Sequence, residues 1–146
     1  MAEEMVKVRL RGPSPDEVET LWATPVGADQ YRLENSPFFA YGVSWEDVVE
    51  AHLDDDYLEF TRCTSKSGNR TIRMIGDFSQ ENETAQEFLK ELVDLGCSYE
   101  GMNYRMISIN IPPVVDLERV TDFLSKPDWI KWEYADPTYD EISGTE

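Results

Sequence analysis

The stretch ETAQEFLKELVDLG, residues 83–96, is the strongest structural signal in this sequence and decides the fold. Its apolar residues recur at helical spacing, at Phe88, Leu89, Leu92 and Leu95. We therefore expect an amphipathic helix with one buried face. Thr84 and Glu87 form a predicted capping box at its start, and Gly96 supplies the left-handed residue that ends it.

Strands are predicted on both sides of this helix. RTIRMIG, residues 70–76, precedes the helix and has the composition of a strand. CSYEG, residues 97–101, and RMISINI, residues 105–111, follow it. These two segments predict a hairpin that turns around residues 101–103.

A second helix and a last strand complete this half of the chain. Asp116 is the predicted N-cap of a helix within residues 112–127, and Pro127 ends it. The inward-facing residues of this helix are Leu117, Val120, Phe123 and Leu124. WIKWEYA, residues 129–135, alternates apolar and charged side chains as a strand does. The order of elements over residues 70–136 therefore predicts a ferredoxin-like βαββαβ unit, with two helices on one face of an antiparallel sheet.

Residues 1–69 contain short strand patterns instead of helices. The segments predicted as strands are residues 6–10, 19–26, 31–35, 47–53 and 57–63. We expect them to form a small antiparallel, barrel-like β-unit, which makes the protein α+β. The triplet Asp54-Asp55-Asp56 is expected at a hairpin tip, since aspartate favours turn conformations. Residues 137–146 are predicted to be a loose acidic tail.

The charge of the chain favours one class of partner. With 30 acidic and 13 basic residues, the formal net charge is −17. Such a charge repels nucleic-acid phosphates and anionic membrane surfaces, so neither is an expected partner. It attracts basic proteins, which we therefore expect as partners. The alternative is that the acidity serves solubility alone.

Cellular location and redox state are also constrained. The N-terminus lacks the features of a signal peptide, and no apolar run has the ~20 residues that a membrane helix needs. Cys63 and Cys97 belong to no C-x-x-C pair. We expect a cytoplasmic protein with two free thiols.

The sequence contains no recognisable catalytic or cofactor motif, so we expect no cofactor, no metal and no enzymatic activity. His52 is the single histidine; it could share a metal with Asp54 on one strand face, but a solvent-facing structural role is favoured. No glycine-rich phosphate loop and no nucleophile elbow is present. Carboxylate pairs carry little weight in so acidic a chain.

An aromatic cluster is the candidate binding site. Four rings crowd into eight positions: Phe38, Phe39, Tyr41 and Trp45. One interpretation is that they plug the β-unit and attach it to the second unit. The other is an aromatic pocket, rimmed by acids, that binds an arginine or lysine of a partner. The predicted partner-binding residues are Phe39, Tyr41, Trp45, Asp54, Asp55 and Asp56.

A family resemblance rests on the same region. The matching segments are LWA at residues 21–23, YRL at 31–33, Asn35, PFFA at 37–40, GVS at 42–44 and DVV at 47–49. With later similarities in SGNRTIRMI, LGC and IPPVVDL, this pattern resembles a bacterial family of small uncharacterised proteins, domain-of-unknown-function family 4265. The resemblance extends over most of residues 6–136 and implies no catalytic residues and no established activity.

These observations predict a non-catalytic acidic binding protein of the cytoplasm. Its most concrete form is an immunity or antitoxin-type inhibitor of a basic protein. One alternative is a small-ligand sensor or regulatory domain that uses the aromatic residues as its pocket. A second alternative is a hydrolase whose site the sequence does not reveal.

Overall fold

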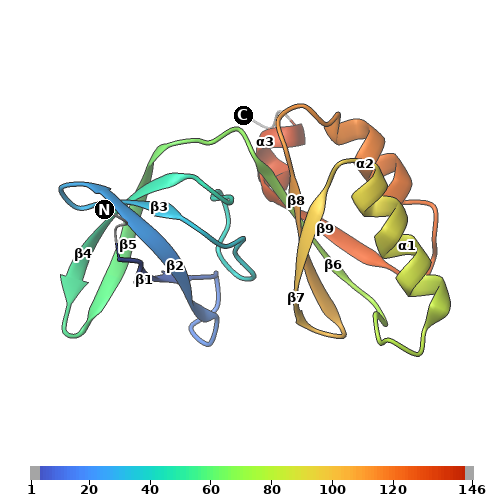
Figure 1. Cartoon of the computed structure of the whole chain (residues 1–146), viewed down its shortest axis with the longest axis horizontal. Coiled ribbons are helices and arrows are strands. Elements are labelled where there is room, and N and C mark those ends of the chain that lie inside the picture. Colours follow the sequence, from blue (N-terminus) through green and yellow to red (C-terminus); the bar gives the residue numbers. More distant parts are fainter. Residues whose placement is uncertain (1–3, 144–146) are drawn as a thin grey trace.

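The first five strands of the computed structural model close into a ring (Figure 1). The structure describes residues 4–143. The ring strands are β1 (Val6–Arg11), β2 (Val18–Gly27), β3 (Gln30–Leu33), β4 (Val48–Asp54) and β5 (Tyr57–Ser65). Consecutive strands pair antiparallel, and a short parallel pairing of β1 with β5 at Val8 and Arg9 closes the ring. The barrel-like unit is therefore confirmed, except that its closing pair is parallel.

The interior of the ring is filled by one side of each strand. Its buried residues are Val8, Leu10, Leu21, Ala23, Leu33, Ala40, Val43, Val49 and Ala51. Their alternation with exposed residues along β1 and β2 follows from the two-residue period of a strand. Ala40 and Val43 come from the segment between β3 and β4, so this segment covers part of the ring.

The second half of the chain is the predicted ferredoxin-like unit. Its strands are β6 (Arg70–Ile75), β7 (Ser98–Asn103), β8 (Met106–Ile111) and β9 (Lys131–Asp136), in the order β7-β8-β6-β9. All neighbours pair antiparallel. The helices α1 (Glu83–Asp94) and α2 (Leu117–Leu124) cover the face of the sheet that points away from the ring (Figure 1). They meet at Phe88 and Phe123, whose stacked rings are 4.4 Å apart.

Two local predictions were wrong. The N-cap of α1 is Asn82, whose side chain accepts a hydrogen bond from the Ala85 amide, so the Thr84–Glu87 capping box is not used. Asparagine caps a helix as well as threonine does, and the helix begins earlier than predicted. The hairpin between β7 and β8 turns after Asn103, not at residues 101–103, because the Asn103 side chain accepts from the amides of Arg105 and Met106.

Other end signals were confirmed. Gly96 has φ 107°, the left-handed conformation expected at the end of α1. Asp116 caps α2 by accepting from the Glu118 amide. The expected loose tail is instead helical in α3 (Tyr139–Ser143), where Glu141 accepts from the Thr138 amide. The remainder of that predicted tail, residues 144–146, lies outside the described residues.

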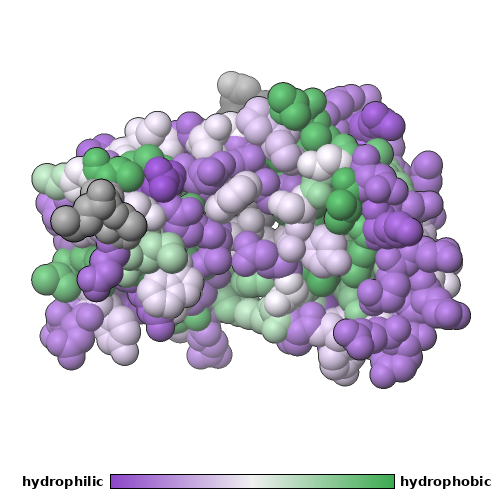
Figure 2. All heavy atoms as spheres, viewed as in Figure 1, coloured by the Kyte–Doolittle hydropathy of each residue, from purple (hydrophilic) through white to green (hydrophobic). Residues whose placement is uncertain are grey.

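The face of the molecule shown in Figure 2 is mostly polar. Hydrophilic residues cover most of both ends of the face shown in Figure 2, and hydrophobic residues appear there in separate groups. Among the described residues, no helix has the length and apolarity required to cross a membrane.

Candidate functional site

The segment between β3 and β4 runs across the open face of the second sheet, strand by strand. Its contacts follow the strand order: Ser36 to Glu100 on β7, Pro37 to Ser108 on β8, Ala40 to Arg73 on β6, and Tyr41 to Glu133 on β9. We call residues 36–44 the crossing segment. It lies between the ring and the second sheet in Figure 1, and it is the principal joint between them.

Glu19 on β2 holds the crossing segment from the side of the ring. Its carboxylate accepts hydrogen bonds from the amides of Phe38, Phe39 and Ala40, at 2.8, 2.8 and 2.9 Å. Three successive amides that point at one carboxylate form an anion-binding concavity. A single carboxylate therefore holds three successive amides of the segment.

Arg73 on β6 holds the same segment from the side of the second sheet. Its guanidinium donates to the carbonyl oxygens of Pro37, Phe39 and Ala40. It also lies 4.5 Å from the ring centroid of Tyr41, in cation–π geometry. The residue is only 2% exposed, and these acceptors replace the water that its Nη1 and Nη2 atoms lose, whereas its Nε has no hydrogen-bond partner among residues 4–143.

A second polar cluster lies at Ser44, the last residue of the crossing segment. The Lys66 ammonium lies 2.6 Å from both Asp47 and Asp136, and the Ser44 hydroxyl bonds Asp136 and Thr71. Burial lowers the pKa of Lys66, but the hydrogen bonds to Asp136 and Asp47 raise it by more than burial lowers it. The pKa of Lys66 is therefore above the usual lysine value. Through the contacts of Ser44 and Lys66 with Asp136, the cluster links the first half of the chain to the second sheet.

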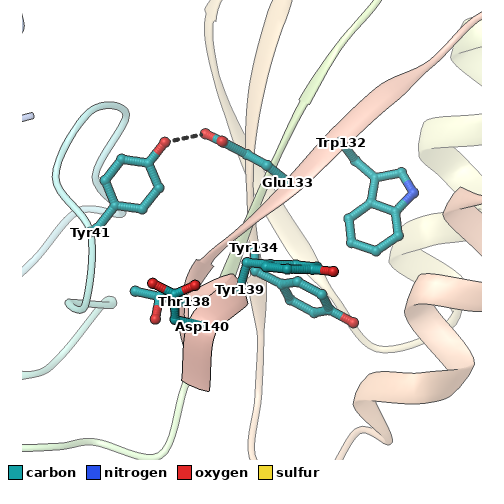
Figure 3. A pocket seen from close by; sticks show the side chains of 7 residues that line it. All are labelled: Tyr41, Trp132, Glu133, Tyr134, Thr138, Tyr139 and Asp140. Carbon is teal, nitrogen blue, oxygen red and sulfur yellow. Dashed lines mark hydrogen bonds between the residues drawn. The ribbon is translucent and has the colours of Figure 1, made fainter. Parts of the chain in front are cut away.

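The candidate site is a cleft where the crossing segment meets β9 and α3 (Figure 3). It has a volume of about 480 Å³ and is lined by Tyr41, Trp132, Glu133, Tyr134, Thr138, Tyr139 and Asp140. We call it the β9 cleft. The Tyr41 hydroxyl donates to Glu133 at 2.7 Å, and the Trp132 and Tyr134 rings meet edge to face with centroids 5.1 Å apart. Burial and the bond to Glu133 raise the pKa of Tyr41, so its hydroxyl stays protonated as the donor.

The chemistry of the β9 cleft suits a cation. Four aromatic rings present π-faces or edges, and two carboxylates accompany them. Tyr139 is 68% exposed and Glu133 is 52% exposed, so both remain accessible to a ligand. An aromatic surface with nearby carboxylates attracts ammonium and guanidinium groups through cation–π contact and charge.

The structure separates the aromatic residues predicted to form one pocket. Tyr41 lines the β9 cleft, whereas Trp45 lines a different hollow of about 300 Å³ beside Tyr99 on β7. Because β7 and β9 are the two edges of the sheet, these hollows lie at opposite edges. Phe39 contributes its backbone to the joint, and none of the rings of Phe38, Phe39 and Trp45 belongs to either core cluster. The prediction of a single pocket was wrong. The other interpretation agrees in part with the structure, because the segment that carries Phe38 and Phe39 attaches the β-unit to the second unit, although their side chains do not belong to the core of the β-unit.

The acidic triplet lies elsewhere. Asp54, Asp55 and Asp56 are exposed at the β4–β5 hairpin tip, with φ 58° at Asp55, which confirms the predicted turn. Figure 1 shows this tip at the outer end of the ring, far along the molecule from β9. The triplet therefore does not rim the aromatic residues, because the crossing segment faces the second sheet and the hairpin points away from it.

The remaining sequence candidate is His52. Its ring bonds Glu50 at 2.7 Å and lies 3.7 Å from Asp29, on the exposed side of β4. Within residues 4–143, no group of three or more histidine, cysteine, aspartate and glutamate side chains is arranged to hold a metal ion.

Sequence reasoning missed most of the residues that line the β9 cleft. Trp132 and Tyr134 were recognised only as the apolar positions of the last strand, and Tyr139 and Asp140 were assigned to a loose tail. The available signal was the density of rings and acids in WEYADPTYDE, residues 132–141. Its meaning depends on Tyr41, which comes from a distant part of the chain.

Comparisons with known proteins place the chain in a family. Its fold is similar to that of a solved structure described as "Novel crystal structure of a hypothetical protein from Neisseria gonorrhoeae". The two chains share 16% sequence identity and a TM-score of 0.74, over 95% of this chain and 98% of that chain. This likeness shows the fold alone. No curated protein matches the chain. The model of a family described as "Domain of unknown function (DUF4265)" matches residues 19–133, which include most of β2, the crossing segment and most of the second sheet. The chain therefore belongs to the DUF4265 family.

Proposed function

We propose that this protein is a non-catalytic binding protein of the cytoplasm and that its partner is a basic protein. The β9 cleft receives an arginine or lysine side chain of that partner. In its most concrete form, the protein is an immunity or antitoxin-type inhibitor that covers a basic functional surface. The observation that carries this proposal is the combination of four aromatic rings and two carboxylates in one open cleft.

The protein's own cations support this use of aromatic rings. Arg73 lies 4.5 Å from the Tyr41 centroid, and Arg9 lies 4.3 Å from that of Tyr57. Arg73 also lies 3.5 Å from Glu133, so a buried guanidinium beside the cleft already contacts two of its lining residues, Tyr41 and Glu133. The opposite wall, with Tyr139 and Asp140, has no such internal cation among the described residues.

The net charge supports the choice of a basic partner. A charge of −17 on 146 residues produces a negative potential over the whole molecule. That potential speeds encounter with a basic protein, and its effect weakens as salt screens it. The cleft would then supply the short-range contacts that slow dissociation.

The test is affinity capture from the native host with matched variants. The cleft variant carries Glu133→Gln and Asp140→Asn, and the control carries Asp54→Asn, Asp55→Asn and Asp56→Asn at the distant hairpin. We expect wild type to capture a basic protein at low salt and to lose it at high salt. The cleft variant should dissociate from that protein about tenfold faster, whereas the triplet variant should mainly slow association. Capture that is equal for all three proteins would refute the role of the cleft.

A small-ligand regulatory role is the second candidate, because a volume of about 480 Å³ falls within the usual range of ligand pockets. Its ligand would be a small organic cation. Titration with tetramethylammonium or arginine, followed by tryptophan fluorescence, tests this role. Saturable quenching that Tyr139→Ser abolishes, with no basic protein captured from the host, would favour the regulatory role over the inhibitor.

A further inference from the structure

β7 is the other outer strand of the second sheet, and its outer side is open. It pairs with β8 on one side and ends the sheet on the other. Every residue of this strand except Glu100 is exposed. An exposed outer strand presents unpaired backbone groups to other chains. The backbone of β7 is therefore a candidate surface for pairing with another polypeptide.

The direction of the backbone groups in β8 follows from one hydrogen bond. The Gly76 amide donates to the Arg105 carbonyl, and this pair continues the β6–β8 register by one residue. Hydrogen-bonded pairs recur at every second position of an antiparallel ladder. Ile107 and Ile109 therefore point their amide and carbonyl groups toward β6. Ser108, which lies between them, points its groups toward β7.

The register of β7 then identifies its free groups. Glu100 lies opposite Ser108 and forms the hydrogen-bonded pair, so Tyr99 and Gly101 direct their backbone groups away from β8. Met102 is the extra residue of a bulge, so the regular part of this edge consists of the Tyr99 amide, the Tyr99 carbonyl and the Gly101 amide. Among residues 4–143, no other group forms a hydrogen bond with these three. They make a free row of donor, acceptor and donor.

An acidic, aromatic hollow lies beside this row. The hollow lined by Trp45 and Tyr99, which we call the β7 hollow, has a volume of about 300 Å³ and also includes Glu34 and Glu100. Glu100 projects toward the crossing segment, where its Oε2 accepts from the Ser36 amide at 2.8 Å. Its Oε1 forms no hydrogen bond with the described residues. The β7 hollow therefore offers a free carboxylate oxygen and an indole ring to a cationic side chain.

We propose that an extended segment of a basic partner protein adds to the sheet along β7, at Tyr99 and Gly101, with one basic side chain in the β7 hollow. Main-chain hydrogen bonds give such a segment its affinity, and the hollow selects its side chains. The inference rests on the proposed function for the basic partner, but it does not use the β9 cleft, which lies at the opposite edge of the sheet. A second copy of this chain is disfavoured as the occupant, because two molecules of charge −17 repel each other.

The position of Glu100 sets the sequence preference of the added strand. The residue opposite Glu100 lies on the same face of the sheet, with its Cβ about 5 Å away, and opposite charges at such a position attract. This residue is therefore arginine or lysine. Its two neighbours project from the other face, where the side chain of Tyr99 is 38% exposed, and apolar residues suit that place. The preferred pattern is one basic residue between two apolar residues.

The probe is the peptide acetyl-Thr-Val-Arg-Val-Thr-amide, and each of two control peptides changes one of its properties. The first control carries a methyl group on every backbone nitrogen, so it cannot donate a hydrogen bond to the Tyr99 carbonyl. The second control has glutamate in place of arginine, so it is repelled by Glu100. Amide hydrogen exchange of the protein, followed by NMR, shows where each peptide binds.

Matched variants of the protein test the same two properties. Gly101→Pro removes an outward amide without removing a bond to β8, and proline is tolerated on an outer strand. Gly101→Ala is its control, because a Cβ there would meet its nearest atoms at 3.5 Å, an ordinary contact. Glu100→Gln removes the charge but keeps an oxygen that accepts from the Ser36 amide. Circular dichroism checks the fold of each variant.

We expect the arginine peptide at saturation to slow amide hydrogen exchange at Tyr99 and Gly101 about tenfold. Backbone methylation, the exchange of arginine for glutamate, Gly101→Pro and Glu100→Gln should each weaken binding by about tenfold, whereas Gly101→Ala should not weaken it. If Gly101→Pro unfolds the protein, the methylated peptide and the exchange rates still test the main-chain bonds.

Three results would overturn strand addition at β7. A peptide that binds without slowing exchange at Tyr99 and Gly101 occupies another surface, and the proposed function then stands without this inference. A peptide that does not bind refutes the inference, and capture of a basic protein from the host decides the proposed function separately. Slow exchange in the protein alone that is lost on dilution would show that a second copy occupies the edge.

Discussion

Glu19 and Arg73 hold opposite sides of the same four-residue segment, Pro37–Ala40. The carboxylate accepts hydrogen bonds from the amides of the segment, and the guanidinium donates hydrogen bonds to its carbonyl oxygens. Glu19 belongs to the ring and Arg73 to the second sheet, so the segment is fixed between the two units. The PFFA sequence that supports the family resemblance is thus a structural joint, and it carries Tyr41 to the β9 cleft.

Removal of the Glu19 carboxylate should destabilise the whole protein. Glu19→Ala leaves three amides without their charged acceptor, and we expect a loss of about 2–4 kcal/mol in the free energy of unfolding. Urea denaturation measures this loss. Glu81→Ala, at an exposed position, is the control and should change stability by less than about 0.5 kcal/mol. Similar losses in the two variants would show that the joint contributes little.

Gly42 should be required because of its backbone conformation and not because a side chain would clash with neighbouring atoms. Its φ is 79°, and a Cβ placed there would meet no atom within 4 Å. Gly42→Ala should therefore cost about 1–2 kcal/mol, which is the penalty for a left-handed residue with a side chain. Gly27→Ala has no positive φ to maintain and should be nearly neutral in the same thermal or urea melts. A neutral Gly42→Ala would mean that the crossing segment adjusts freely.

The sequence predicts local structure well here and long-range contacts poorly. The stripe in α1 and the alternation in β9 are local patterns, so the order of elements and the ferredoxin-like sheet could be derived from them. The start of α1 was misplaced because Asn82 and Thr84 are both good caps. The choice between these two caps depends on contacts that form only in the folded chain.

The site was harder to predict for a related reason. Tyr41 was identified because rings crowd around it, but its partner Glu133 is 92 positions away. No local pattern links such residues. The triplet at residues 54–56 was placed beside the aromatic residues because it is near them in sequence, whereas the β4–β5 hairpin carries it to the other end of the molecule. Nearness along the chain was a poor guide where a hairpin reverses its direction.

His52 should titrate above the usual histidine range. The hydrogen bond to Glu50 raises its pKa, and nearby Asp29 adds to this effect. The chain has one histidine, so its proton NMR signals identify it without assignment. We expect a pKa above about 6.5 in wild type and a lower value in Glu50→Gln. An unchanged pKa in Glu50→Gln would show that the two side chains do not interact in solution.

Both cysteines should react slowly with thiol reagents in the folded protein. Burial raises the pKa of Cys97 to about 11, and burial with nearby Asp47 raises that of Cys63. Since only the thiolate is nucleophilic, iodoacetamide at about pH 8 should modify the native protein far more slowly than the urea-unfolded protein. Cys63 is less buried and should react before Cys97, as mass spectrometry of the alkylated peptides would show. Rapid alkylation of Cys97 would indicate that the second unit opens readily.

Lys66 should make stability depend on pH in the alkaline range. Its pKa is raised above 10.5 in the folded state, so its contribution is complete below the unfolded value and is lost as pH rises through the folded value. Lys66→Met leaves Asp47 buried beside Asp136 without a cation and should cost about 1–3 kcal/mol near neutral pH. The lysine side chain is 46% exposed, which places the cost toward the lower end of this range.

Urea melts of wild type and Lys66→Met should differ in the free energy of unfolding. This stability gap should be constant from about pH 7 to 9 and should narrow above about pH 10.5. Other groups that titrate in this range act on both proteins and cancel in the gap. Lys90→Met, at an exposed helical position, should show no such gap at any pH. If the Lys66→Met gap widened or stayed constant above pH 10.5, the Lys66 ammonium would not be the group that holds the joint.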